Sequence, residues 1–320
     1  MQKTKTARGN QMKAVYLDKK GGADSLISGE IQQPNPDAGQ VLVKVHATAI
    51  MPGEVRWIPT FQTRSGSPRP FPIVLGHEFS GVVEGNGSSS SMFSAGEEVF
   101  GVNDWFSNGA QAEYCVVEES GLAHKPKSLT HAEAAVVPIS ALTAWQGLFD
   151  KANLQRGQDV LIHGAAGSVG MFAVQLALWR GARVIATASS GSEEFVRALG
   201  ADRVIDYRKT PFEDVICDVD VVLDTVGGET LERSWKVLKP GGRIVTVATG
   251  SEQSREPRVR DAFMIVRADG SQLAKIAWMI DAGELRVFMG PTFDLAEARE
   301  AYDRAAHGGI RGKIALRIIE

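Results

Sequence analysis

A short glycine-rich stretch contains the residues whose types and spacing most directly suggest chemistry. Gly164, Gly167 and Gly170 lie between an apolar run at residues 160–163 and an amphipathic stretch at residues 169–180. Glycine permits a tight turn and a close approach of the backbone to a ligand, and the amide groups at a helix start attract negative charge. The simpler alternative is a strand-to-helix turn without a ligand. Because strand and helix patterns flank the loop, the sequence favours a phosphate-binding loop for a dinucleotide.

We therefore expect six residues to contact the pyrophosphate: Gly164, Ala166, Gly167, Ser168, Val169 and Gly170. An acidic residue about 20 positions further on, after the next strand, would bind the free ribose of NAD. The chain instead reads Thr-Ala-Ser-Ser-Gly-Ser over residues 187–192. The sequence thus favours NADP(H), with Ser189 and Ser190 as hydrogen-bond donors to the extra phosphate. Capping of a helix that begins near Ser192 is the alternative role of these serines.

Alternating strand and helix patterns predict the elements that position this loop. Strands are expected at residues 160–163, 184–187, 203–206, 219–223 and 243–247, with helices at 169–180, before residue 200 and at 231–238. Strands that are apolar on both faces and alternate with helices form a parallel sheet that is covered on each side. The expected fold class is α/β, with a doubly wound Rossmann sheet.

The residues before and after this sheet have a different pattern. Short β-type runs at 12–16, 41–45, 81–84, 98–101 and 114–117 alternate with Gly, Pro and Ser clusters, which is typical of an antiparallel, barrel-like region. Helical periodicity covers residues 130–150 with a break at Pro138. After residue 274 the pattern predicts a helix at 276–280, a strand at 285–288, a helix at 295–306 and a strand at 313–318. We infer a split first domain whose last part follows the sheet.

Composition and charge exclude several classes of protein. The 320 residues include 35 basic and 38 acidic side chains, for a net charge of −3 and a pI of about 6.1, so neither nucleic acid nor a membrane surface is an expected partner. Cys115 and Cys217 form no Cys-x-x-Cys motif, which excludes a disulfide framework and a cysteine-based structural zinc site. We expect a cytoplasmic protein without a membrane span, and a disordered extension at residues 1–11.

Several motifs together resemble the medium-chain dehydrogenase/reductase superfamily, specifically its zinc-independent quinone oxidoreductase branch, the zeta-crystallin-like enzymes. These motifs are the glycine loop, Pro-Ile-Val-Leu-Gly-His-Glu-Phe-Ser-Gly at residues 72–81, Ala-Leu-Thr-Ala-Trp at 141–145, residues 199–202 and 204–207, Asp-Thr-Val-Gly-Gly at 224–228, and residues 311–313. The resemblance implies a Rossmann NADP-binding domain at residues 131–274, inserted in a groES-like β-barrel catalytic domain at residues 12–130 and 275–320. It also implies an active site between the domains and a homodimer.

The resemblance implies further cofactor contacts. Thr143 would approach the nicotinamide, Tyr207 would pack beside the 2′-phosphate, and Arg311 is a candidate for binding that phosphate. The nicotinamide would face residues at or after the ends of later strands: Val226, Val247, Ala248, Thr249, Phe263 and Ile265.

The residue types disfavour a catalytic zinc. Zinc-dependent alcohol dehydrogenases of this superfamily use a cysteine on an early loop, the histidine of a Gly-His-Glu motif, and a second cysteine or acidic residue. The chain keeps His77 and Glu78 but has Met51 and Glu54 on the early loop and Pro-Ile-Ser-Ala at residues 138–141. Because a catalytic zinc requires three protein ligands and an open position, we expect no metal. Glu54 could join the other two side chains, so a zinc enzyme stays an alternative.

A reaction follows from this expectation. Without a Lewis acid, alcohol oxidation loses a large stabilisation, whereas quinones and α,β-unsaturated carbonyl compounds accept a hydride directly. We expect NADPH-dependent reduction of such an acceptor, with Glu54, Trp57, His77 and Trp105 as substrate-contacting candidates because indoles offer flat apolar surfaces. Ordinary packing is the alternative for both tryptophans. The alternative functions are a zinc-dependent alcohol dehydrogenase that uses His77 and Glu78, and a non-catalytic, crystallin-like NADPH-binding protein.

Overall fold

The computed structural model describes residues 10–319, which form two units. Unit 1 comprises residues 10–138, 268–281 and 287–319, and unit 2 comprises residues 139–267 and 282–286. Unit 2 is thus inserted in the sequence of unit 1. The expected domain boundaries, after residues 130 and 274, stay predictions. Of the expected N-terminal extension, residues 1–9 lie outside the described residues, and Gln11 begins a strand.

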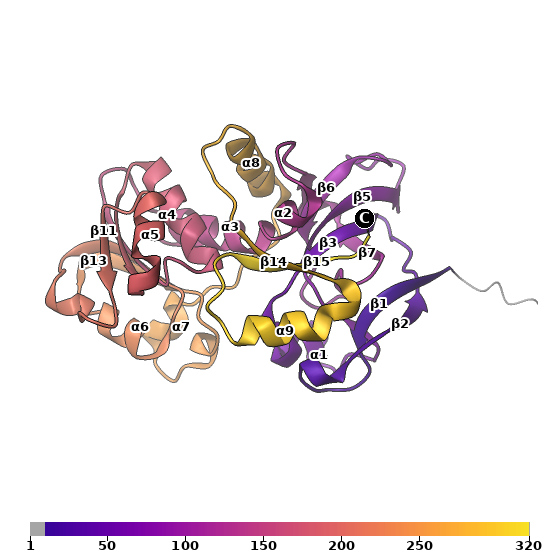
Figure 1. Ribbon diagram of the computed structural model, residues 1–320, viewed down its shortest axis with the longest axis horizontal. Helices are drawn as coiled ribbons and strands as arrows, with labels where there is room; N and C mark the ends of the chain where they lie inside the picture. Colours follow the sequence, from indigo (N-terminus) through magenta and orange to yellow (C-terminus); the bar gives the residue numbers. More distant parts are fainter. Residues whose placement is uncertain (1–9, 320) are drawn as a thin grey trace, which may run out of the picture. The chain divides into compact units, whose positions relative to one another are not determined.

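Unit 2 contains a five-stranded parallel sheet with the strand order β11-β10-β9-β12-β13. The strands are β9 (Asp159–His163), β10 (Arg183–Ala188), β11 (Arg203–Asp206), β12 (Val219–Asp224) and β13 (Leu238–Thr246). The helices are α3 (Pro138–Trp145), α4 (Ser168–Arg180), α5 (Glu193–Ala198), α6 (Gly228–Ser234) and α7 (Pro257–Ala262). Helices α4 and α5 lie on one side of the sheet, and α6 and α7 lie on the other (Figure 1). The doubly wound α/β fold is confirmed.

The strands of this sheet read as continuous apolar runs because they are buried on both faces. Leu161, Val222 and Ile244 from three strands share a core with Leu231 of α6 and Val259 of α7. All strand pairs are parallel, so the carboxyl ends of the five strands meet at one edge of the sheet. The loops that follow the strands are therefore brought together at that edge.

Unit 1 is built mainly from antiparallel strands. One sheet has the order β2-β1-β4, and a second has the order β14-β15-β3-β5-β6-β8 with β7 paired to β3. The strands are β1 (Gln11–Leu17), β2 (Leu26–Gln32), β3 (Gln40–Ala49), β4 (Ile73–Val74), β5 (Glu78–Asn86), β6 (Glu98–Val102), β7 (Tyr114–Glu118), β8 (Leu122–His124), β14 (Met289–Asp294) and β15 (Lys313–Arg317). The helices are α1 (Ile58–Phe61), α2 (His131–Ala135), α8 (Gly270–Asp281) and α9 (Ala298–Ala306).

Two larger cores and two smaller apolar clusters stabilise the described part of unit 1. Val43, Phe79 and Val99 belong to the core of the larger sheet, where their strands lie side by side. A second core joins the smaller sheet to the C-terminal segment of the chain, with Leu17 of β1 packed in the same cluster as Tyr302 of α9. The residues after unit 2 are therefore an integral part of unit 1.

Two expected elements differ from the structure. The strand expected at residues 285–288 is wrong, because β14 begins at Met289 and the backbone of Arg286 instead exchanges two hydrogen bonds with the Gln175 side chain. The helix expected at residues 231–238 is wrong at its end. Helix α6 stops at Ser234, and the carbonyl oxygen of Val237 accepts a hydrogen bond from the Val219 backbone, which draws the following residues into the sheet.

The expected break at Pro138 is confirmed, since α2 ends at Ala135 and α3 begins at Pro138. Helix α3 continues as a π-helix, Gln146–Lys151. None of the helices between residues 10 and 319 combines the length and the apolar character that a membrane crossing requires.

Candidate functional site

The glycine loop joins β9 to α4 in unit 2, and its conformation explains two of its glycines. Gly164 has a φ of +70°, and a Cβ there would overlap the Thr225 hydroxyl. A Cβ at Gly170 would overlap the Gly164 carbonyl oxygen and approach the Cα of Ala165 to 2.6 Å. A side chain at Gly164 would push the loop away from the residues after β12, and a side chain at Gly170 would push the loop away from α4. These glycines therefore serve the shape of the turn itself.

The N-terminus of α4 suits an anion. Gly167 is the N-cap, so no side chain occupies the first turn as a cap, and that turn contains no acidic residue. The amide groups of the following residues, Ser168 and Val169 first, are those that an α-helix cannot pair internally. The partial positive charge of the 13-residue helix adds to their attraction for a negative group. This cradle fits the diphosphate of a dinucleotide.

Ser189 and Ser190 follow β10 at the same edge, and the side chain of Ser190 has a partner from the neighbouring strand. The hydroxyl of Ser190 donates to Oδ2 of Asp206 at 2.5 Å, and the backbone N–H of Arg208 donates to Oδ1 at 3.1 Å. These two hydrogen bonds, the first above all, lower the pKa of the Asp206 carboxyl. Ser189 caps no helix through its side chain, and Ser190 is not the N-cap of α5, so the alternative capping role of these two serines is not observed.

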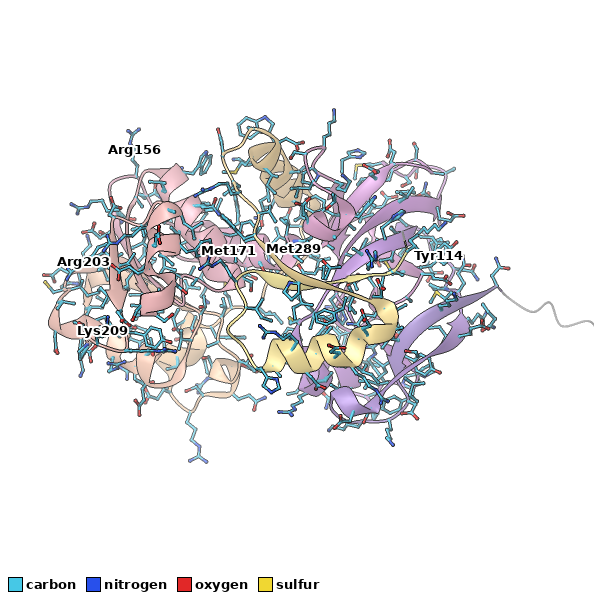
Figure 2. The ribbon with its side chains drawn as sticks, in the orientation of Figure 1. Tyr114, Arg156, Met171, Arg203, Lys209 and Met289 are labelled. Atoms are coloured by element: carbon cyan, nitrogen blue, oxygen red, sulfur yellow. The ribbon has the colours of Figure 1, made fainter. Side chains whose placement is uncertain are left out.

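One cation lies beside this carboxylate, and a second lies over the neighbouring ring of Tyr207. Nζ of Lys209 lies 3.4 Å from Oδ2 of Asp206, and the Arg208 guanidinium lies 5.6 Å from the centre of the Tyr207 ring. Lys209 is labelled in Figure 2. The ring of Tyr207 is 53% exposed. The end of β11 thus presents one anion, two cations and an exposed aromatic ring next to the serine pair.

Apolar residues at the other end of this edge are exposed as well. Val226 follows β12 and is 56% exposed, and Ile265 follows α7 and is 41% exposed. Phe263 pairs with Thr246 at the end of β13, which leads into the residues Val247, Ala248 and Thr249. Exposed branched side chains at a sheet edge offer an apolar surface for a flat ring.

Asp224 organises the backbone of this end. Its buried carboxylate accepts hydrogen bonds from the Thr246 hydroxyl at 2.7 Å and from the backbone N–H groups of Val226 and Gly227 at 3.0–3.1 Å. Gly227 has a φ of +78°, and a Cβ there would lie 2.6 Å from the Cβ of Ala248. The carboxylate therefore fixes the turn after β12 relative to β13.

Two expected cofactor residues belong to other elements of the chain. Thr143 is buried in α3, and its hydroxyl donates to the Ile139 carbonyl oxygen at 2.6 Å within the same helix. Arg311 belongs to unit 1, in the turn before β15. Roles for both in cofactor binding stay predictions.

The four candidates for substrate contact lie together in unit 1. His77 follows β4, and its Nδ1 lies 2.7 Å from Oε1 of Glu54, with both side chains buried. The His77 ring lies 5.2 Å from the Trp105 ring, and Trp105 lies 4.9 Å from Trp57 in an edge-to-face arrangement. The structure thus joins a buried histidine–carboxylate pair to two partly exposed indoles.

The acidic residue of the Gly-His-Glu motif, Glu78, has a partner other than His77. Glu78 is buried and forms an ion pair with Lys313 of β15. His77 and Glu54 are hydrogen-bonded to each other rather than grouped with Glu78. Within residues 10–319, no group of three or more His, Cys, Asp and Glu side chains is placed to hold a metal ion.

Several residues of these sites were missing from the sequence expectation. Asp206 ends an expected strand and Arg208 and Lys209 follow it, so their position at the end of β11 was a usable signal. No local pattern pointed to Tyr302, which donates to Glu54 at 3.2 Å across 248 residues, or to the pairing of Lys313 with Glu78.

Comparisons with known proteins agree with this architecture. Residues 37–127 match the family model for the alcohol dehydrogenase GroES-like domain, and residues 199–316 match that for zinc-binding dehydrogenases. The chain is 32% identical over 307 residues to a probable mitochondrial zinc-binding oxidoreductase of Arthroderma benhamiae, covering 89% of this chain and 90% of that protein. It is 33% identical over 321 residues to the chloroplastic NADPH-dependent alkenal/one oxidoreductase of Arabidopsis thaliana, covering 96% and 79%.

A solved structure is similar over nearly the whole chain. The quinone oxidoreductase from Coxiella burnetii superposes with a TM-score of 0.88 at 29% sequence identity, covering 97% of this chain and 100% of that one. A Rossmann sheet inserted in the sequence of a GroES-like domain, together with these relatives, defines an oxidoreductase that uses a nicotinamide cofactor. The chain belongs to the medium-chain dehydrogenase/reductase superfamily, which confirms the resemblance seen in the sequence.

Proposed function

We propose that the protein is an NADPH-dependent reductase that delivers a hydride to quinones or α,β-unsaturated carbonyl compounds without a catalytic zinc. The observation that carries this proposal is the separate pairing of His77 with Glu54 and of Glu78 with Lys313. Because each of these side chains already has a partner, they do not form the three-ligand set of a catalytic zinc site. The names of the Arabidopsis and Coxiella relatives support the two classes of acceptor.

The chemistry of these acceptors suits the groups that are present. NADPH supplies the hydride when it is bound, and the acceptor spreads the resulting negative charge onto its own oxygen. The protein then contributes mainly alignment and the exclusion of water, which require no Lewis acid. In this proposal the amide groups at the start of α4 bind the diphosphate, and Val226 and Ile265 pack against the nicotinamide. The faces of Trp57 and Trp105 bind the planar acceptor.

The preference for NADPH rests on charge at the ends of β10 and β11. Lys209 and Arg208 offer two cations, and Ser189, Ser190 and Tyr207 offer hydroxyl groups, for an extra phosphate. Asp206 opposes this preference, because a carboxylate at such a position repels a phosphate and favours a free ribose. Two positive charges against one negative charge leave a local excess that favours the phosphorylated coenzyme.

An assay of coenzyme, acceptor and metal together tests the proposal. In the reduction assays, purified protein is given NADPH or NADH together with a quinone, an enone or an aldehyde. In the oxidation assay, it is given the oxidised coenzyme and a primary alcohol. Each assay is run with and without a chelator, and the metal content of the protein is measured. We expect NADPH oxidation with the quinone or the enone that the chelator leaves unchanged. Alcohol oxidation that is lost with the chelator, in protein that contains one zinc per chain, would instead establish the zinc enzyme suggested by the name of the fungal relative.

A non-catalytic protein is the remaining alternative. Tight NADPH binding without turnover of any quinone or enone would favour it over the reductase. Formation of a homodimer and a cytoplasmic location stay predictions, and the two relatives named above carry mitochondrial and chloroplastic names.

A further inference from the structure

A chain of buried hydrogen bonds begins at α9 and ends at His77. Nε2 of Gln111 donates to the Tyr302 hydroxyl at 2.8 Å, and that hydroxyl donates to Oε2 of Glu54 at 3.2 Å. Oε1 of Glu54 lies 2.7 Å from Nδ1 of His77. All four side chains are buried. Burial in a low-dielectric interior makes each of these bonds costly to lose, so the chain holds one arrangement.

Glu54 is fixed more firmly than a single ion pair would fix it. Its Oε2 also accepts the backbone N–H of Gly76 at 3.0 Å, and its Oε1 accepts the backbone N–H of His77 at 3.2 Å. Two backbone donors, the phenol and the imidazole thus surround one carboxylate. These contacts fix the orientation of the Glu54 carboxylate and, through it, the plane of the His77 ring.

His77 also contacts the loop that contains Trp105. Nε2 of His77 lies 3.3 Å from the carbonyl oxygen of Ser107, and the His77 ring lies against the Trp105 ring. The backbone N–H of Asn103 donates to the His77 carbonyl oxygen at 2.8 Å. The loop at residues 104–108 is therefore attached to His77 through the residues on both sides of Trp105.

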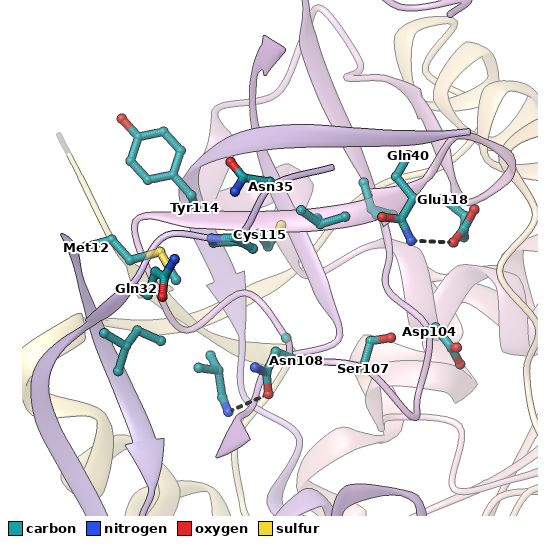
Figure 3. A pocket seen from close by; sticks show the side chains of 16 residues that line it. Met12, Gln32, Asn35, Gln40, Asp104, Ser107, Asn108, Tyr114, Cys115 and Glu118 are labelled. Carbon is teal, nitrogen blue, oxygen red and sulfur yellow. Dashed lines mark hydrogen bonds between the residues drawn. The ribbon is translucent and has the colours of Figure 1, made fainter. Parts of the chain in front are cut away.

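The other side of this loop lacks close packing. Asp104, Ser107 and Asn108 line a cavity of about 260 Å³ that is bounded by β7 and by the end of β2 (Figure 3). Besides its contacts with His77, the loop is held by Arg64, which donates to Asp104 and lies over the Phe106 ring. Oδ1 of Asn108 also accepts hydrogen bonds from Arg69 and from the backbone N–H of Val74. Because the cavity leaves room for the loop to move on that side, the position of Trp105 depends on its ring contacts with His77 and Trp57 and on the polar contacts of the loop.

We propose that Tyr302 is a positioning residue for the acceptor site: through Glu54 and His77 it holds Trp105 against Trp57, and so determines how well large planar acceptors bind. This inference rests on the proposed function only for the identity of the acceptor. The geometry requires no contact between Tyr302 and any ligand, since the Tyr302 side chain is buried. Tyr302 is connected to Trp105, the proposed acceptor contact, through Glu54 and His77: two contacts are hydrogen bonds and the third is the contact between the His77 and Trp105 rings.

Removal of the phenol hydroxyl alone tests the proposal. In Tyr302→Phe the ring that packs in the core stays, while Glu54 loses one donor and Gln111 loses the acceptor of its amide. Oε1 of Gln111 already has no hydrogen-bond partner among the described residues, so in this variant the Gln111 amide also loses the acceptor of its Nε2 group. We expect the side chains of His77 and Trp105 to lose their fixed positions, while side chains elsewhere keep theirs.

The first readout needs neither cofactor nor acceptor. The full chain is labelled with 5-fluorotryptophan, and the ¹⁹F resonances of the six tryptophans are assigned with single Trp→Phe variants. We expect the Trp105 and Trp57 resonances to shift or broaden in Tyr302→Phe, while those of Trp179 and Trp278 stay in place. Tyr16→Phe, which removes a hydroxyl from β1, is the matched control and leaves all six unchanged. Unmoved Trp105 and Trp57 resonances would overturn the proposal.

The second readout is kinetic. With 9,10-phenanthrenequinone as the large planar acceptor, we expect the KM of Tyr302→Phe to rise about tenfold, whereas the Kd for NADPH, from nucleotide fluorescence, changes less than twofold. If Tyr302→Phe fails to fold, Glu54→Gln serves instead, because it keeps the shape of the side chain and removes its charge. An unchanged KM in folded variants would refute the role of Tyr302. Wild-type protein that reduces no quinone or enone would refute the proposed function and leave the ¹⁹F test intact.

Discussion

The sharpest test of the cofactor site places a negative charge at the start of α4. Gly167 is the N-cap of this helix, with a φ of −78°, so an aspartate there meets no backbone strain. Its Cβ would lie 3.2 Å from the Gly164 carbonyl oxygen, which requires a shift of only a few tenths of an ångström. Aspartate is also a favourable N-cap residue, so Gly167→Asp should fold at least as well as the wild type.

The size of the effect follows from electrostatics. Two unit charges about 5 Å apart repel by about 3 kcal/mol at an effective dielectric constant of about 20. Salt screens an exposed helix end, which lowers this figure, while the second charge of a diphosphate raises it. We expect Gly167→Asp to weaken NADPH binding by about 2–3 kcal/mol, which corresponds to about a 30- to 150-fold higher Kd.

The assay is an equilibrium titration followed by nucleotide fluorescence at two salt concentrations. Gly167→Asn is the matched control, because it adds almost the same volume and the same capping ability without the charge. The asparagine variant should bind within about threefold of the wild type, and the difference between the two variants should shrink at high salt. Equal Kd values for the two variants would show that no diphosphate lies at this helix end.

Three further predictions concern charge, acidity and metal. Lys209→Met should raise the Kd for NADPH about tenfold and leave that for NADH within twofold, as measured by paired titrations; equal losses for both coenzymes would remove Lys209 from the phosphate site. Burial lowers the pKa of His163 to about 3 in the folded protein, from about 6.5 in the unfolded chain. The neutral His163 therefore costs no stability above pH 6.5, and the free energy of unfolding falls as the pH drops from about 6.5 toward 3. Between pH 7 and pH 4, the free energy of unfolding in urea should therefore decrease by about 3 kcal/mol less in His163→Gln than in the wild type. Parallel pH profiles of the two proteins would contradict the lowered pKa of His163. Dialysis against a chelator should leave both quinone reduction and thermal stability unchanged, and a drop in melting temperature that zinc restores would establish a metal site that the pairing of Glu78 with Lys313 argues against.

The α/β architecture could be predicted because its determinants are local. The apolar run at residues 160–163 and the helical period of residues 169–180 each lie in one continuous segment. The left-handed conformation of Gly164 belongs to the short turn between these two segments. The strand expected at residues 285–288 failed for the opposite reason. Its apolar residues suit a strand, but the Gln175 side chain, more than a hundred residues away, binds the backbone of Arg286.

The sites divide in the same way. The sequence by itself determined the strand, glycine turn and helix start of the proposed diphosphate site, since these are consecutive in the chain, and it picked out Glu54, His77, Trp57 and Trp105 as candidates by residue type. Only the tertiary structure decided their partners. The parallel pairing of β10 with β11 places Asp206 beside Ser190, and the packing of α9 places Tyr302 against Glu54, 248 residues away. Hydrogen bonds act over about 3 Å in space and are indifferent to separation along the chain, so no local pattern contains them.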